Sequence, residues 1–153
     1  MTAITRMETW FSILIETPDD TLISRIIWQN LHPRLEKDIG YLVEQLDYKL
    51  WPGDEDQLTD LIPRIADRVI GRKNFDAQPV ADLFMLLRDD HPQIACRVLD
   101  VLSAKLQSGE LQGERLEQLK TAMALPLMPL LADDSEHVLS ASAATLAASW
   151  GNE

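Results

Sequence analysis

Residues 86–106 read LLRDDHPQIACRVLDVLSAKL, and residues 130–150 read LLADDSEHVLSASAATLAASW. The two stretches align without a gap at an offset of 44 residues, and each carries two leucines, two aspartates and then apolar residues at spacings of three and four. Such spacings are typical of an amphipathic helix. Each stretch therefore reads as the end of one helix, a tight acidic turn and a second helix, and a weaker third copy begins at Leu14. A hairpin of this kind cannot bury both of its faces alone, so neighbouring hairpins must stack.

The rest of the chain shows the same helical periodicity. Its clearest apolar stripe consists of Leu35, Ile39, Leu42, Val43, Leu46 and Leu50. No stretch alternates with a period of two, and no Asn-Gly or Asp-Gly hairpin signal is present. We therefore predict an all-α protein that forms one domain over residues 1–153. Prolines, glycines and acidic residues separate eight predicted helices, near 4–16, 19–31, 34–51, 55–71, 77–89, 92–107, 113–132 and 136–150.

One helix start follows from local sterics. A residue that precedes proline avoids the α region, and proline itself is favoured at the first position of a helix. We therefore predict that His91 is the N-cap of a helix that begins at Pro92.

The paired leucines and aspartates carry a family resemblance. Together with a preceding helix that contains Pro126 and Pro129, they resemble HEAT and armadillo-type repeats, whose period of roughly 40–47 residues includes the observed offset. The resemblance is clearest over 76–150, weaker over 4–31 and poor over 33–72. It implies an α–α superhelix of about four helical hairpins. It also implies a non-catalytic scaffold or adaptor that grips another protein on the concave face built by the second helix of each hairpin.

Composition excludes several kinds of partner. Fourteen Lys and Arg against twenty-five Asp and Glu give a net charge of −11. Neutralising phosphates needs a basic face, so we predict no nucleic-acid partner. The apolar runs are too short to cross a bilayer, and we predict no membrane partner. A single cysteine and an N-terminus without an apolar leader segment fit a reducing compartment, so we expect a cytoplasmic protein.

The sequence also lacks the usual signatures of catalysis. The three histidines are too far apart for a metal-ligand motif, and one cysteine excludes a cysteine-based zinc site. No glycine-rich phosphate loop and no GxSxG motif is present. We predict no catalytic residue, no metal and no cofactor, and that the protein is not an enzyme.

Two kinds of residue are candidates for partner binding. Acidic pairs in the turns would line up as a negative ridge along one edge of a stack, although helix capping alone can explain them. Trp28 and Trp51 are candidate aromatic anchors, because Ile26 and Ile27 are expected to fill the inner face beside Trp28. The predicted partner-binding residues are Trp28, Trp51, Asp89, Asp90, Asp133 and Asp134.

Two further functions remain open at this stage. The net charge of −11 fits an acidic inhibitor or immunity protein that blocks a basic cleft, for example that of a nuclease. The family resemblance also fits an accessory protein of an enzyme, as in the HEAT-like lyases that handle bilin chromophores.

The last predicted helix is rich in alanine. Small side chains allow a neighbouring backbone to approach closely. If the face that carries Ala144 is buried, a leucine at that position would overpack the interface.

Overall fold

The computed structural model describes residues 9–10, 12–14, 16–17, 20–35, 37, 39–49, 55–132 and 138–151. Within these residues it contains no strand and seven complete helices, with short helical pieces at 9–10 and 12–14 ahead of them. The helices are α2 (Thr21–Leu35), α3 (Ile39–Lys49), α4 (Glu55–Ile70), α5 (Gln78–Asp90), α6 (Pro92–Gln107), α7 (Glu114–Ala132) and α8 (Val138–Trp150). The prediction of an all-α protein is confirmed.

The start of α6 follows the local prediction. His91 is the N-cap, with φ −133° and ψ 60°, and Pro92 is the first helical residue. The His91 side chain forms no capping hydrogen bond. The steric effect of Pro92 on the preceding residue therefore places this boundary.

The predicted boundary at residues 31–34 is wrong. Helix α2 continues through Pro33 to Leu35, and α3 begins only at Ile39. Proline inside a helix costs about 3 kcal/mol when it removes an interior hydrogen bond. Here it lies in the last turn, and the continued helix buries Leu35 on the same face as Leu31. Burying a leucine contributes about 1.5–3 kcal/mol, which offsets most of that cost.

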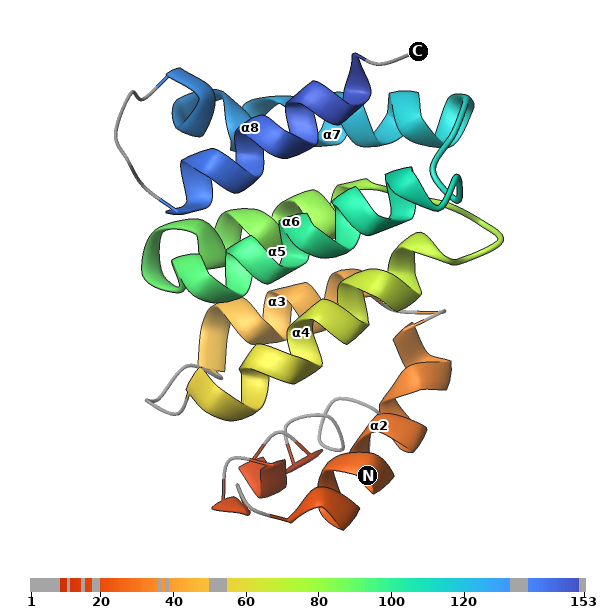
Figure 1. The fold of residues 1–153 in the computed structure, drawn as a ribbon. Coiled ribbons are helices and arrows are strands. Elements are labelled where there is room, and N and C mark those ends of the chain that lie inside the picture. The colour runs from red at the N-terminus through yellow and green to blue at the C-terminus, as the bar shows by residue number, and fades with distance from the viewer. Residues whose placement is uncertain are drawn as a thin grey trace.

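The helices form two layers. Helices α2, α4, α6 and α8 pack side by side in one layer, and α3, α5 and α7 pack in the other. Successive helices pack across the layers, α5 against α6 and α7 against α8, so the chain rises through rows of two helices (Figure 1). This arrangement assigns α4 to the layer of second helices, a point that the sequence left open. The core lies between the layers and is almost entirely aliphatic.

The two aligned stretches bury equivalent residues. On the second helix of each stretch, Ala95 and Leu139, Leu99 and Ala143, and Leu102 and Leu146 are all buried. The 44-residue repeat is therefore a repeat in packing as well as in sequence.

The alanine-rich helix α8 buries a different face from the one considered in the sequence. Ala144 is exposed, whereas its neighbour Ala143 is fully buried. A leucine at position 144 would point into solvent, so Ala143 is the position at which the helix packs closely.

Candidate functional site

The last turn of α5 holds an internal ion pair between adjacent residues. Arg88 Nε lies 2.8 Å from Asp89 Oδ1, and a second guanidinium nitrogen of Arg88 donates to the carbonyl of Pro126 in α7. The hydrogen bond from Arg88 lowers the pKa of Asp89, and the ion-pair attraction acts in the same direction. Asp89 therefore orients an arginine that ties α5 to α7.

Asp90 has a different setting from the one predicted. The sequence places it between the two helices, but it is the last residue of α5 and is exposed. A carboxylate at a helix C-terminus opposes the helix dipole.

Replacing Asp90 by asparagine should leave stability unchanged or raise it by about 0.3–1 kcal/mol, because the change removes that unfavourable charge. Chemical denaturation of the variant beside the unchanged protein measures the difference. A clear loss of stability would show that the Asp90 carboxylate has a structural partner.

Trp28 is half-buried and packs against the core. Its ring meets His32 edge-to-face at a centroid distance of 5.7 Å. The expectation that Ile26 fills the inner face is wrong, because Ile27 is buried and Ile26 is exposed.

Trp51, Asp133 and Asp134 fall outside the described residues. Asp20 accepts hydrogen bonds from the backbone N–H groups of Leu22 and Ile23 at 2.9 and 3.1 Å, and so caps α2. The structure thus shows a capping role for one acidic turn. Of the six predicted residues it describes three, Trp28 on α2 and Asp89 and Asp90 on α5.

Carboxylates in the layer of second helices pair with cations of the same layer. Asp60 of α4 lies 2.8 Å from Arg97 of α6, and Asp67 of α4 lies 3.0 Å from Lys105 of α6. Lys105 also contacts Glu110 at 2.6 Å. The hydrogen bond with Glu110, followed by that with Asp67, raises the pKa of Lys105 despite partial burial. Asp60 and Asp67 of α4 are therefore each paired with a cation of α6.

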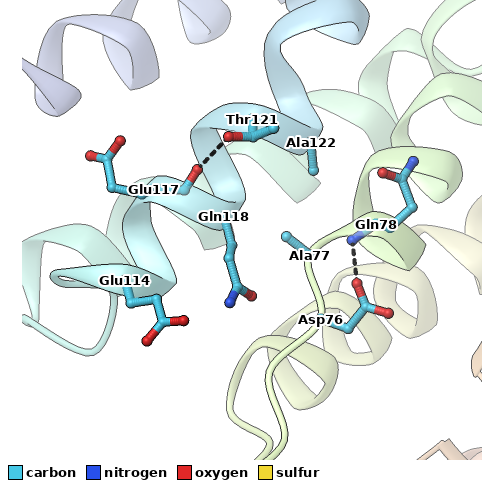
Figure 2. Close-up of a pocket in the computed structure, with 8 residues that line it drawn as sticks. All are labelled: Asp76, Ala77, Gln78, Glu114, Glu117, Gln118, Thr121 and Ala122. Atoms are coloured by element: carbon cyan, nitrogen blue, oxygen red, sulfur yellow. Dashed lines mark hydrogen bonds between the residues drawn. The ribbon is translucent and has the colours of Figure 1, made fainter.

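A shallow pocket of about 450 Å³ lies between α5 and α7, in the other layer. None of the residues that line it is basic. The lining residues are Asp76, Ala77, Gln78, Glu114, Glu117, Gln118, Thr121 and Ala122. In Figure 2, Gln118 and Ala122 of α7 point toward the segment that carries Asp76, and Glu117 lies on the outer rim. None of the predicted partner-binding residues lines this pocket.

Local interactions position the acidic groups of the pocket. Asp76 Oδ1 accepts a hydrogen bond from the backbone N–H of Gln78 at 3.0 Å, which fixes the carboxylate at the start of α5. Arg115 of α7 donates to the carbonyl of Arg72 and lies 5.3 Å from the centre of the Phe75 ring. These two contacts tie the segment before α5 to α7, the two parts of the chain that line the pocket.

The pocket offers hydrogen-bond acceptors and negative charge. It suits a lysine or arginine side chain of a partner, which can enter between Asp76 and Glu114 and meet the Gln118 amide. Across the described ranges, no group of three His, Cys, Asp or Glu side chains is placed to hold a metal ion. The half-buried Cys96 contacts Ser142, with Sγ 2.9 Å from Oγ.

Comparisons with known families, with curated proteins and with solved structures found no match for this chain. Among the helices of the described residues, none has the length and apolar character needed to cross a bilayer.

Proposed function

We propose that this chain is a HEAT-like helical-repeat protein that acts as a non-catalytic scaffold for another protein. The two-layer packing and the 44-residue repeat in burial support a stack of helical hairpins of this type. The scaffold binds a lysine- or arginine-bearing segment of its partner at the pocket between α5 and α7.

The acidic lining of the pocket carries this proposal. In the layer of second helices, Asp60 and Asp67 already have cationic partners from the same chain. Asp76 and Glu114 line the same pocket, whose lining includes no cation, and Glu117 of that lining pairs with Lys120 at 2.9 Å. A basic side chain from outside complements the charge of Asp76 and Glu114. We therefore propose that the partner binds at α5 and α7, rather than on the concave face that the resemblance implies.

Site-specific photocrosslinking tests the scaffold proposal. A photoreactive amino acid replaces Gln118 in the pocket, and in a matched control it replaces Ser103 in the hollow between α6 and α8. After irradiation of cells that produce the protein, the Gln118 position should give a discrete adduct that the Ser103 position does not. Equal adducts from both positions, or none from Gln118, would contradict binding at the pocket.

The net charge of −11 favours a second candidate, the acidic inhibitor of a basic cleft. The dependence of partner affinity on salt concentration distinguishes the two functions. A partner held at the pocket meets at most the three carboxylates of its lining, so its affinity should fall gently with ionic strength. An inhibitor that covers a basic cleft engages many more carboxylates, and its affinity should fall steeply.

A further inference from the structure

The outer surface of α5 and α7 continues along both helices beyond the pocket. At the pocket, Gln78 at the start of α5 and Gln118 of α7 line the same hollow. Near the end of α5, Arg88 donates to the carbonyl of Pro126, farther along α7, at 3.3 Å. These two points of contact show that α5 and α7 run side by side in the same direction.

Two exposed apolar side chains lie along this surface. Met85 of α5 is 48% exposed, and Leu125 of α7 is 74% exposed. Each follows the pocket glutamine of its own helix by seven residues, Gln78 in α5 and Gln118 in α7. Seven residues are close to two helical turns, so each apolar residue lies on the same face as that glutamine, about 10 Å farther along the helix. We call Met85 and Leu125 the apolar pair.

The pocket end of the surface is acidic. Asp76 and Glu114 line the pocket, which has no basic residue in its lining. Asp82 lies between the pocket and the apolar pair, and its Oδ1 accepts a hydrogen bond from Gln78 Nε2 at 2.8 Å. A cation that enters the pocket therefore meets carboxylates, and one of its neighbours is already oriented along α5.

The other end of the surface is largely without free charge. Residues 121–132 of α7 include no charged side chain. Beyond Met85 on α5, Asp89 is paired with Arg88 at 2.8 Å. The surface therefore changes from negative charge at the pocket to apolar contact at the apolar pair.

We propose that this surface binds a helix of the partner that carries a lysine or arginine and, seven positions away on the same face, an apolar residue. Charge complementarity places the basic side chain in the pocket, and the apolar side chain covers Met85 and Leu125. The inference rests on the proposed function and specifies the segment that the scaffold selects.

The distance between the pocket and the apolar pair favours a helix. Residues seven apart on one face of a helix are separated by about 10 Å, which equals the separation along α5 and α7. Side chains on one face of an extended segment are separated by about 6.6 or 13 Å, so an extended segment fits the two positions less well.

Two synthetic peptides of equal composition test the spacing. Each is an alanine-rich helix of about 20 residues with one central arginine and two leucines. The leucines stand seven positions before and after the arginine in the first peptide, which allows binding in either direction. They stand five positions away in the second peptide, about 140° around the helix from the arginine. Circular dichroism verifies that both peptides are equally helical.

The peptides are titrated into the isotopically labelled full chain and followed by NMR. The first peptide should bind about tenfold more tightly than the second, because only it buries a leucine while its arginine is in the pocket. It should shift the backbone resonances of both Gln118 and Leu125, whereas the second peptide should shift those around Gln118 alone.

Three variants assign the two contacts. Leu125→Ala should remove the tenfold preference and leave the affinity for the second peptide unchanged. Leu22→Ala on α2, where Leu22 is 63% exposed, is the matched control and should keep the preference. Asp76→Asn should weaken binding of both peptides, because it removes charge from the pocket while keeping an oxygen that can accept from the Gln78 N–H.

The outcomes separate this inference from the proposed function. Equal affinity of the two peptides, with shifts at Gln118, would overturn the spacing and leave the pocket as a site for a basic side chain. A preference that survives Leu125→Ala would place the leucine contact elsewhere and would also overturn the inference. No shift at Gln118 with either peptide would contradict both the inference and the proposed binding of a basic side chain at the pocket.

Discussion

Replacing Phe84 by alanine is expected to lower the free energy of unfolding by about 3–5 kcal/mol. Phe84 lies in α5, which packs between α3 and α7 in its layer and against α6 across the core. Its side chain is among the largest in the protein that are fully buried. Truncation removes the hydrophobic contribution of the ring and leaves a cavity at the centre of the stack. Because domains are stable by only about 5–15 kcal/mol, this loss is a large part of the total.

The adjacent residue provides the control for Phe84. Met85 is 48% exposed on the same helix, so Met85→Ala should change stability by less than about 1 kcal/mol. Urea denaturation followed by circular dichroism measures both variants. Similar losses for the two would show that α5 does not present the Phe84 face to the core.

Replacing Ala143 by leucine is expected to destabilise the protein by about 1–3 kcal/mol. Ala143 is fully buried on α8, the helix that packs most extensively on α6 and also contacts α7. Three additional carbon atoms at this position must push the helices apart or distort side chains.

Ala144→Leu is the paired control, one residue along the same helix. Its side chain is exposed, and leucine is nearly as good a helix former as alanine, so stability should change by less than about 0.5 kcal/mol. Thermal unfolding of both variants beside the unchanged protein measures the difference. A larger loss in Ala144→Leu than in Ala143→Leu would show that the faces of α8 are assigned the wrong way round.

The candidate pocket arises from the layered arrangement of the helices, because α5 packs beside α7. The segment before α5 is held to α7 by Arg115, whose guanidinium reaches Arg72 and Phe75.

The helical periodicity, the breakers and the repeat were sufficient to predict the all-α class and most helix positions. These features act over a few residues. Pro92, for example, restricts His91 through direct steric contact, and the start of α6 needs no tertiary information. Spacings of three and four likewise identify an apolar face, and the buried residues Leu99 and Leu102 lie on one.

Only the tertiary structure decided which apolar faces are covered and which distant residues meet. Pro33 lies inside α2 because Leu35 reaches the core, and Ala143 rather than Ala144 is buried because α8 packs against two neighbours. Asp76 and Glu114 are 38 residues apart and share a pocket only because α5 packs beside α7. Leu87 and Leu131 occupy the same place in the repeat, yet one is buried and the other exposed. The free energy of burying a side chain depends on what packs against it, and a local pattern contains no information about that neighbour.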